Sequence, residues 1–454
     1  MSCTEAEIES IFDRKNGNPA IEAIHTANER GEIETMFYSE VRPVTWYSMN
    51  PRPLPCKVAN QVYSYIVEGN HSYLLYTYLT SETPPLAVKQ EFLDNTRIAW
   101  CRNLLAEMIA SCSLSLNDST VFSSMDREWM VFNSNFFVEG NHRQHDRGIG
   151  NTEELQTFRT MLPRHRLSLM QPWFYSKCSP SSFPIFYMNS QSSLVHKYKY
   201  NLSIVDLLRM EVMVDEVWTP VKPELHRLHG VPPEGKMEAP VLWGNMAKTR
   251  DNEADWNRCN RKLIPIYAET IVSAGVEGLK CGQEASVKLE SGGPVKAIFW
   301  GLRNKTAETY NIRSNYTSNL EDPVNGPSVA GHCSLEYRDT TKLSEMEPNH
   351  FEWPLLKYHL PSTPRCNGLY GYTFCHDVNA YGDNVAANLE SLGAKFVIRL
   401  EDQDYYRWCN GNTDVRTGQT FVPVQSETIY SLVVRMLVMR KYTISSTGEV
   451  RRVY

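Results

Sequence analysis

Residues 112–117, Cys-Ser-Leu-Ser-Leu-Asn, alternate apolar and polar side chains one after the other. Successive side chains of a β-strand point to opposite faces of the sheet, so this alternation predicts a strand with one buried face. The same pattern recurs at 166–169 and, with Val397 as its exception, at 395–401. From residue 41 onward the sequence therefore predicts a protein built of β-strands.

Two other runs, 73–79 and 295–300, are mostly apolar on both faces. Such strands are expected where both faces of a sheet are covered. One helix is predicted among the strands of the first half. Asp126 can cap it, and its large apolar residues share one face, namely Trp129, Phe132 and Phe136.

The chain has 454 residues. One hydrophobic core rarely grows beyond about 250–300 residues, so two domains are expected. Three long polar stretches interrupt the β pattern, at 139–156, 220–261 and 301–331. Loops longer than about 15 residues are usually functional or displayed to solvent, so all three are predicted to be surface loops. The middle one is the best boundary, which predicts one β domain at 39–218 and a second at 219–454.

The first 38 residues predict a helical N-terminal arm (1–38). Thr4 and Glu7 have capping-box spacing, and the apolar residues that follow share one helical face, namely Ile8, Ile11 and Phe12. Asn18-Pro19 can start a second short helix that carries Ile21, Ile24 and Ala27. Helices this short are unstable alone in water, so the arm must pack either on its own domain or on a partner.

The two ends of the chain carry net charges of opposite sign. The net charge of −6 argues against a nucleic-acid coat, which needs a basic face to neutralise phosphates. Residues 1–35 hold eight acidic and three basic side chains, whereas 435–454 hold five basic ones, including Arg451 and Arg452, and one acidic one. The arm is therefore expected to suit a basic partner.

Neither secretion nor a membrane span is predicted. The first thirty residues lack the apolar segment of a signal peptide, and no run of about 18 apolar residues occurs in the sequence. The eleven cysteines include no C-x-x-C pair, which indicates reduced thiols rather than a disulfide framework.

No catalytic, cofactor-binding or metal site is predicted. Phosphate-loop, dinucleotide-binding, H-E-x-x-H and G-x-S-x-G motifs are absent from the sequence. His142, His145 and Asp146 could bind a metal in principle, but they fall in a polar stretch without a further ligand at useful spacing, and the pair His226 and His229 is similar. Cys375 and His376 are adjacent, and adjacent residues of a strand point to opposite faces, which suits a nucleophile and its base poorly.

Five stretches, taken in order, carry a family resemblance. They are Val41-Arg-Pro-Val-Thr-Trp-Tyr47; Trp100 to Ile109 with Ser113 to Asp118; Leu167 to Tyr187; Gly293-Pro-Val-Lys-Ala-Ile-Phe-Trp300; and Gly368-Leu-Tyr-Gly-Tyr-Thr-Phe374 with Asn388-Leu and Phe396-Val-Ile-Arg-Leu400. Their order and spacing over about 40–440 resemble the major capsid proteins of nucleocytoplasmic large DNA viruses, the group of iridoviruses, phycodnaviruses and marseillevirus-like agents. The late region has His376-Asp-Val-Asn-Ala-Tyr-Gly382 where the family usually has Pro-Glu-His-Gln-Pro-Ser, which indicates a divergent branch.

The resemblance implies an all-β fold of two consecutive eight-stranded antiparallel jelly rolls, with short helices in the arm and loops. It implies a structural protein of the virion rather than an enzyme, assembled inside the infected cell. Homotrimers would form capsomers of nearly hexagonal outline that tile an icosahedral shell. Neighbouring capsomers, minor capsid proteins beneath the shell and an internal viral membrane nearby are the expected surroundings, without direct contact to nucleic acid.

Two alternatives remain open from the sequence. A minor capsid or penton component of a similar virus is one, although a penton usually needs a single jelly roll. A carbohydrate-binding or carbohydrate-active β-sandwich is the other, which aromatic residues at 11% would tolerate. The latter would need exposed tryptophans and paired carboxylates in one cleft, and the sequence nominates no such pair.

Overall fold

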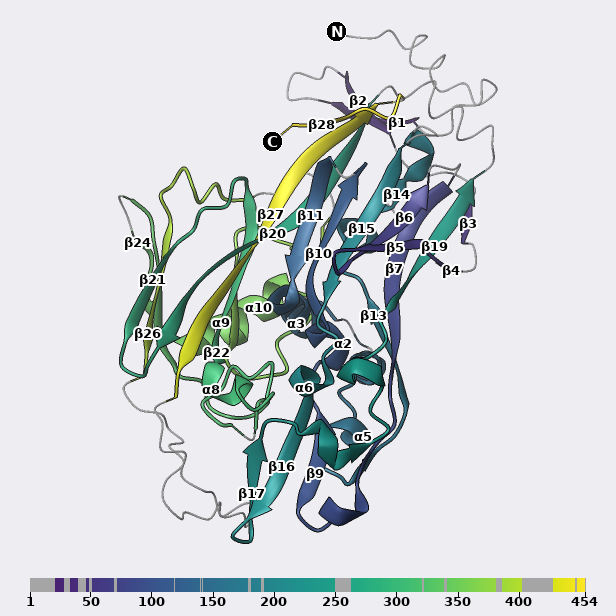
Figure 1. Cartoon of the computed structure of the whole chain (residues 1–454). Coiled ribbons are helices and arrows are strands. Elements are labelled where there is room, and N and C mark those ends of the chain that lie inside the picture. Colours follow the sequence, from purple (N-terminus) through teal and green to yellow (C-terminus); the bar gives the residue numbers. More distant parts are fainter. Residues whose placement is uncertain are drawn as a thin grey trace.

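The computed structural model describes most of the chain after residue 50, and short segments before it. The described residues are 21–27, 33–39, 46–48, 51–68, 72–117, 119–138, 140, 142–178, 181–188, 192–249, 263–320, 322–338, 341–380, 386–401, 428–445 and 447–453. They form two β-sandwiches that lie side by side, with a helix between them (Figure 1). None of the helices in these ranges is both long and apolar enough to cross a membrane.

The second sandwich has eight main strands in two antiparallel sheets. In chain order they are β20 (Leu263–Leu279), β21 (Glu284–Lys288), β22 (Val295–Asn304), β23 (Ala330–Glu336), β24 (Thr341–Met346), β25 (Leu369–Thr373), β26 (Lys395–Leu400) and β27 (Tyr430–Ser445). One sheet has the order β20-β27-β22-β25 and the other β21-β26-β23-β24. Counted from one to eight, the strands pair as 1-8-3-6 and 2-7-4-5, which is the strand order of a jelly roll. A short strand, β28 (Val450–Arg452), adds to β27.

The first sandwich repeats this order. Its eight main strands are β3 (Trp46–Ser48), β6 (Val62–Glu68), β7 (Ser72–Thr83), β10 (Ile109–Leu116), β11 (Thr120–Asp126), β13 (His165–Met170), β15 (Ser193–Tyr200) and β19 (Val241–Thr249). The sheets are β3-β19-β7-β13 and β6-β15-β10-β11, again 1-8-3-6 and 2-7-4-5. Three short strands extend them, β4 (Arg52–Pro53), β5 (Cys56–Ala59) and β14 (Phe183–Pro184). The all-β, double jelly-roll prediction is confirmed.

Long excursions between the strands of the first jelly roll build a lobe at one end of the molecule. It contains two three-stranded sheets, β17-β16-β9 and β12-β8-β18. Their strands are β8 (Leu86–Val88), β9 (Thr96–Trp100), β12 (Met161–Leu162), β16 (Leu208–Val214), β17 (Val217–Val221) and β18 (Leu228–His229). Figure 1 shows β9, β16 and β17 at the end opposite to β28 and the C-terminus.

Short helices occupy the connections. They are α2 (Leu104–Glu107), α3 (Arg127–Phe136), α4 (His142–Ile149), α5 (Glu153–Gln156), α6 (Ile204–Leu207), α8 (Lys305–Glu308), α9 (Pro348–Glu352) and α10 (Pro354–His359). Single 3₁₀ turns are η2 (Gln90–Phe92), η3 (Phe174–Ser176), η5 (Ile185–Tyr187), η6 (Leu225–Arg227) and η7 (Pro233–Gly235). As predicted, α3 begins after Asp126, whose carboxylate accepts a hydrogen bond from the Trp129 backbone N–H at 3.0 Å.

The strands form where the alternation predicts them. In β13, Leu167 and Leu169 are buried while Arg166 and Ser168 are exposed. The doubly apolar run at 295–300 becomes β22, which is covered on both faces. Trp300 packs inside the second jelly roll on Phe351 and Phe396, whereas Phe299 on the other face packs on α3 of the first jelly roll. This strand therefore belongs to two cores at once.

The second predicted helix of the arm is wrong. Residues Ile21–Ala27 form strand β1, which pairs antiparallel with β2 (Ile33–Ser39), Ala27 opposite Ile33. Ile, Thr, Phe and Tyr favour strands, and pairing with a second strand supplies hydrogen bonds along the whole segment. A seven-residue apolar pattern cannot by itself distinguish the two periods. Residues Ile8, Ile11 and Phe12 lie outside the described residues.

The predicted boundary at 218/219 does not agree with the strand pairing. β19 is the eighth strand of the first jelly roll because it pairs with β7 over Val241–Lys248, so this domain continues past the polar stretch. The sequence at 220–261 resembles a linker because prolines and charged residues separate its strands β18 and β19. We therefore propose to divide the chain between Thr249 and Leu263.

The other two predicted surface loops are also folded segments. In 139–156, α4 and α5 bury Ile149 and Leu155 completely. In 301–331, Asn315 and Thr317 are 1% and 0% exposed. Their polar groups bond to each other and to backbone, as where Asn315 Oδ1 accepts from the Thr317 N–H at 2.8 Å. A polar sequence therefore does not mean exposure here.

Candidate functional site at the junction of the two jelly rolls

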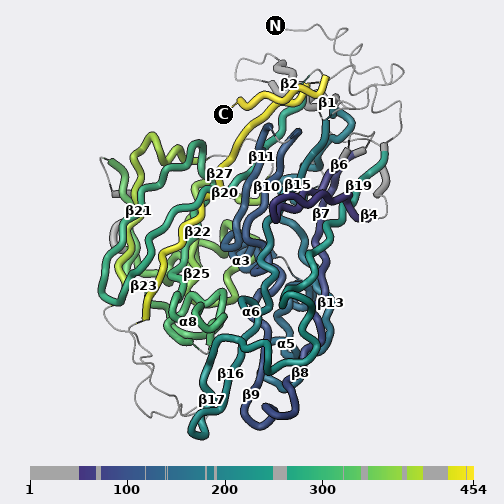
Figure 2. The backbone as a smooth tube through the Cα atoms, in the orientation of Figure 1, coloured from purple at the N-terminus to yellow at the C-terminus, as the bar shows by residue number. Residues whose placement is uncertain are grey.

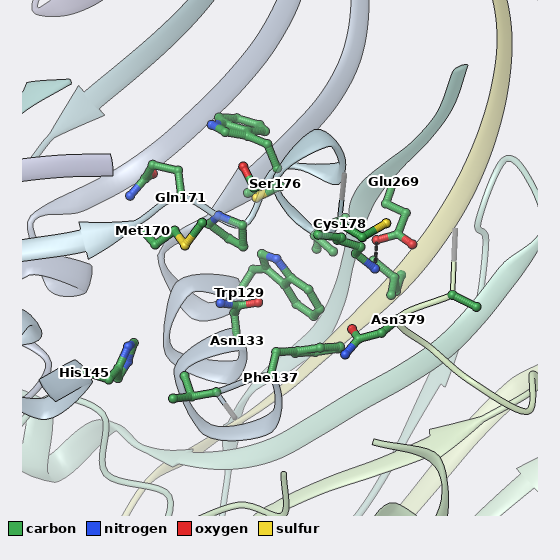
Figure 3. A pocket seen from close by; sticks show the side chains of 18 of the residues that line it. Trp129, Asn133, Phe137, His145, Met170, Gln171, Ser176, Cys178, Glu269 and Asn379 are labelled. Carbon is green, nitrogen blue, oxygen red and sulfur yellow. Dashed lines mark ion pairs between the residues drawn. The ribbon is translucent and has the colours of Figure 1, made fainter. Parts of the chain in front are cut away.

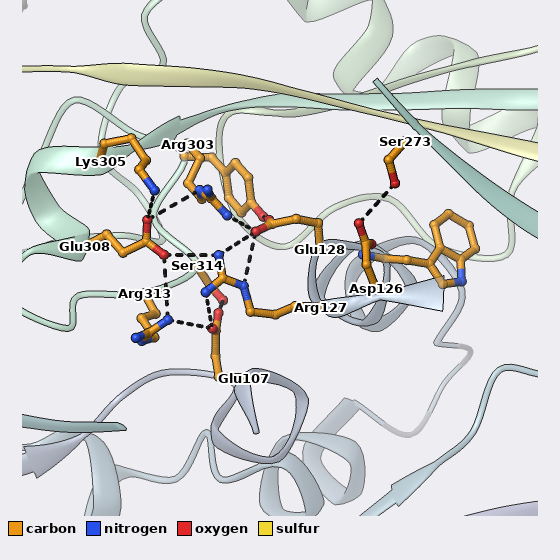
Figure 4. Close-up of polar contacts among 12 residues, drawn as sticks. Glu107, Asp126, Arg127, Glu128, Ser273, Arg303, Lys305, Glu308, Arg313 and Ser314 are labelled. Carbon is orange, nitrogen blue, oxygen red and sulfur yellow. Dashed lines mark hydrogen bonds and ion pairs between the residues drawn. The ribbon is translucent and has the colours of Figure 1, made fainter. Parts of the chain in front are cut away.

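A cluster of charged side chains joins the two jelly rolls (Figure 4). The first contributes Glu107 at the end of α2 and Arg127 and Glu128 at the start of α3. The second contributes its residues from the end of β22 to the segment after α8, namely Arg303, Lys305, Glu308, Arg313, Ser314 and Tyr316. Four basic and three acidic side chains leave a formal charge of +1. We name this set the junction cluster.

Several of its contacts cross from one jelly roll to the other. Arg127 Nη2 lies 3.0 Å from Glu308 Oε1 and also contacts its neighbour Glu128 at 2.8 Å. Arg303 forms an ion pair with Glu128. Buried ion pairs are tolerated only when their remaining hydrogen-bonding groups are also satisfied.

Two hydroxyl groups also take part in the cluster. The Tyr316 hydroxyl donates to Glu128 Oε2 at 2.6 Å, and Ser314 Oγ donates to Glu107 Oε1 at 2.7 Å. Arg313 Nε donates to the Asp206 carbonyl at 2.8 Å, so this part of the second jelly roll also reaches the lobe. Asn311 does the same, because its side-chain N–H groups donate to the carbonyls of Val205 and Leu208.

The two buried glutamates have opposite pKa shifts. Burial opposes the ionisation of Glu128, but the charges of Arg127 and Arg303 outweigh burial and lower its pKa to about 2. For Glu107 burial prevails and raises the pKa, although Arg127 and Arg313 oppose it. Glu128 is therefore the anionic centre of the cluster.

A second set of contacts lies beside α3. Arg435 in β27 reaches Asp126, with 2.6 Å between Nη2 and Oδ2, and Ser273 Oγ donates to the same carboxylate at 3.1 Å. Asp126 thus caps α3 and binds two strands of the second jelly roll. Figure 2 shows β11 next to β20, where Ser123 Oγ donates to the Glu269 carbonyl at 2.5 Å. Together these contacts fix the orientation of one jelly roll relative to the other.

A buried histidine in the first jelly roll is expected to make the stability of the chain depend on pH. His196 is fully buried, and its Nε2 lies 2.8 Å from the Tyr175 hydroxyl. Burial lowers the pKa of His196 to about 3, well below the value of about 6.5 for a histidine in an unfolded chain.

We expect acid to destabilise the chain between about pH 6.5 and 3. In that window His196 takes up a proton in the unfolded chain but not in the folded chain. The free energy of unfolding therefore falls by up to about 1.4 kcal/mol for each unit by which the pH is lowered. The urea midpoint of His196→Gln should therefore fall less steeply from pH 7 to 4 than that of the unchanged chain. His226→Gln, at an exposed position, is the control; parallel curves for His196→Gln would contradict the assignment.

The residues singled out at the C-terminus are exposed and have local partners. Arg451 pairs with Glu449 at 3.1 Å, and Arg452 Nη2 donates to the Gly292 carbonyl at 3.0 Å. Figure 1 draws β28 at the same end as β1 and β2. Their role toward a neighbouring subunit stays a prediction, as does that of Ile8, Ile11 and Phe12.

The structure gives no support for a metal site or a nucleophile at His145, Asp146 or Cys375 within the residues that it describes. Asp146 pairs with Arg365 at 2.6 Å, and burial is the main reason that the pKa of His145 falls to about 4. Burial raises the pKa of the Cys375 thiol, which makes it a poorer nucleophile. Within the described ranges, no group of three or more His, Cys, Asp or Glu side chains is placed to hold a metal ion.

The sequence did not predict the junction cluster, and of the contacts beside α3 it predicted only the helix cap at Asp126. Glu107, Arg127 and Glu128 are separated from Arg303 and Tyr316 by 175 or more positions. One signal was available, since Arg127 and Glu128 follow a predicted cap directly and stand beside a strongly apolar helix face. That pattern does not predict which residues Arg127 and Glu128 contact.

Comparison with known proteins shows which proteins this chain resembles. Residues 280–402, inside the second jelly roll, match the family described as large eukaryotic DNA virus major capsid protein. The major capsid protein of Invertebrate iridescent virus 6 is 24% identical over 375 residues, which covers 76% of this chain and 78% of that protein. The major capsid protein of Frog virus 3 is 23% identical over 370 residues, covering 76% and 77%.

The chain is therefore similar to viral major capsid proteins over about three quarters of its length. It is a structural protein of a virus capsid, and its location is the virion. Solved structures share the fold. A capsid model of the virus PBCV-1 aligns with a TM-score of 0.65 at 10% identity, covering 91% of this chain and 98% of that one. The Faustovirus major capsid protein aligns with a TM-score of 0.61 at 10% identity, covering 92% and 94%. The major capsid protein fold thus persists where sequence identity has nearly vanished.

Proposed function

We propose that three copies of the chain form a capsomer of nearly hexagonal outline, and that such capsomers tile an icosahedral shell. The observation that supports this most is the repeated strand order, 1-8-3-6 and 2-7-4-5, in both jelly rolls. Three copies of a chain with two similar sandwiches present six similar units around one threefold axis. Such an interface is heterologous and closes at three copies.

The junction cluster supports the same proposal. A hexagonal outline requires a fixed angle between the two jelly rolls of each chain. Buried ion pairs with defined geometry supply this constraint better than an apolar contact alone, because each charge must keep its partner. Arg127, Glu128 and Arg303 are the residues that we assign to this role.

The two ends of the molecule suggest its orientation in the shell. Strand β28 and the hairpin β1–β2 lie at one end and the lobe with β9, β16 and β17 at the other (Figure 1). We propose that the lobe faces outward and that the terminal end faces inward, toward minor capsid proteins and the internal membrane. We also propose that the role is structural and not catalytic.

A stable homotrimer is the expected result in solution. Permanent subunit interfaces usually bury more than about 2,000 Å² in total, so the trimer should persist at micromolar concentration. Size exclusion with light scattering should give three times the chain mass of 52.1 kDa, about 156 kDa. A persistent monomer under these conditions would contradict the capsomer proposal, and a stable pentamer would favour the penton alternative.

A further inference from the structure

A cavity of about 680 Å³ lies between the two jelly rolls, and none of its lining residues belongs to the junction cluster. The first jelly roll lines it with α3, the end of β13 and the residues in and after η3. The second lines it with β20, Leu437 of β27 and residues 377–380. The volume falls in the range of about 300–1,000 Å³ that is usual for sites of small organic ligands.

The wall of this cavity is mainly apolar. Its apolar lining includes Met125, Phe137, Met170, Pro172, Ile271 and Leu437. Figure 3 shows the indole of Trp129 in the middle, with Ser176 and Cys178 on one side and Phe137 and Asn379 on the other. Met170 is 50% exposed, which places it at an opening to solvent.

Trp129 and Ser176 each place on the wall a hydrogen-bond donor that lacks an acceptor among the described residues. Trp129 is 3% exposed, and within the described part of the chain its Nε1 has no hydrogen-bond partner. The same holds for the hydroxyl of Ser176. Buried polar groups are nearly always paired, and an unpaired one costs about 1–3 kcal/mol, so a missing acceptor is indicated.

Lys177 offers a third donor and a positive charge. Its Nζ lies 2.6 Å from Glu269 Oε2 and 3.3 Å from the Val378 carbonyl, which uses two of its three N–H groups. Lys296 binds the other oxygen of Glu269 at 2.8 Å and donates to the carbonyls of Val378 and Ala380. The two lysines and one glutamate leave a charge of +1 at this side of the cavity.

The other carboxylate on the wall belongs to Asp377. Asp377 is exposed, and its Oδ1 accepts from the Asn379 backbone N–H at 2.8 Å. The wall of the cavity therefore combines the donors of Trp129, Ser176 and Lys177, the last a charged ammonium group, with apolar side chains. A ligand that fits has an acceptor-only head and a hydrocarbon body.

We propose that this cavity binds a single-chain amphiphile with an anionic headgroup, the head toward Lys177, Trp129 and Ser176 and the chain along Met170 and Leu437. Because both jelly rolls form the wall, the bound amphiphile also stabilises their relative orientation. This proposal is independent of the oligomeric state.

The test uses the purified full-length chain, freed of bound lipid, and three probes below their micelle concentrations. These are dodecanoate, dodecanol with the same chain and no charge, and acetate with the charge and no chain. Isothermal titration should show saturable binding of one dodecanoate per chain, at least tenfold weaker binding of dodecanol, and none of acetate. Absence of saturable binding for all three probes would overturn the proposal.

Three variants identify the place of binding. Lys177→Met leaves Glu269 paired with Lys296 and should weaken dodecanoate binding about tenfold without changing that of dodecanol. Met170→Trp adds bulk from a half-exposed position and should abolish binding of both. Lys288→Met, at an exposed lysine that pairs with Glu290, is the control and should bind like the unchanged chain. Unchanged binding by Met170→Trp, with its unfolding transition intact, would show that the amphiphile binds elsewhere.

Discussion

Replacement of Glu128 by alanine is expected to lower the free energy of unfolding by about 3–5 kcal/mol, because it leaves buried positive charges without their partner. Glu128 is 5% exposed, and its carboxylate is shared by Arg127, Arg303 and the Tyr316 hydroxyl. The formal charge of the junction cluster would rise from +1 to +2. Scanning calorimetry and urea unfolding, both followed at pH 7, measure the effect.

The shape of the transition is the more specific readout. The unchanged chain should unfold in one cooperative transition, because the two jelly rolls share the cluster and β22. In Glu128→Ala the second jelly roll should unfold separately from the first, which gives two calorimetric peaks.

A control and a rescue make this result interpretable. Glu290→Ala removes an equally charged side chain from an exposed pair with Lys288 and should leave the transition unchanged. Glu128→Met combined with Arg303→Met should recover part of the loss, since apolar side chains of similar size can replace a buried ion pair. A loss below about 1 kcal/mol with a single transition would show that the cluster does not hold the jelly rolls together.

Deletion of residues 1–40 is expected to leave a folded trimer that cannot assemble into closed shells. These residues comprise the predicted arm with Ile8, Ile11 and Phe12 and the whole hairpin β1–β2, so no strand is cut. An apolar stripe on a short helix is unstable without a surface to cover it, and we propose that this surface belongs to a neighbour or a minor capsid protein. Electron microscopy of assembly reactions and light scattering of the free protein measure the two properties separately.

The charge of the arm predicts a smaller, salt-dependent effect. The first 35 residues carry a net charge of −5, and the exposed Arg451 and Arg452 are the proposed basic counterpart. Exposed pairs contribute about 0.2–1 kcal/mol each, so Arg451→Gln with Arg452→Gln should slow assembly most at low salt without abolishing it. If the truncated chain fails to fold or to trimerise, the arm is part of the first jelly roll and the assembly role is wrong.

Local patterns located the strands and one helix well. Alternation at 112–117, 166–169 and 395–400 became β10, β13 and β26, and the doubly apolar run at 295–300 became β22. The cap at Asp126 was recognised because capping acts within one helical turn. Each of these features depends on residues that are close in sequence, so each is readable without a structure.

The same reasoning failed where the partner of a segment is remote. Ile21–Ala27 was assigned to a helix, and only the pairing with Ile33–Ser39 makes it a strand. The polar residues of 301–331 were expected at the surface, yet Asn311, Arg313 and Tyr316 are held by the first jelly roll. Polar residues can be buried when the folded chain supplies hydrogen-bond partners for them, and composition does not show whether such partners are present.

The sequence by itself determined that the protein is β-rich, too long for one core, and similar in five ordered stretches to a family of capsid proteins. Only the tertiary structure decided where the first jelly roll ends, because β19 is assigned by its pairing with β7. Only the tertiary structure decided that charges on α3 and after β22 meet in one cluster. Strand periodicity is a property of neighbouring residues, whereas Glu128 and Arg303 are 175 positions apart and pair only because the chain between them folds.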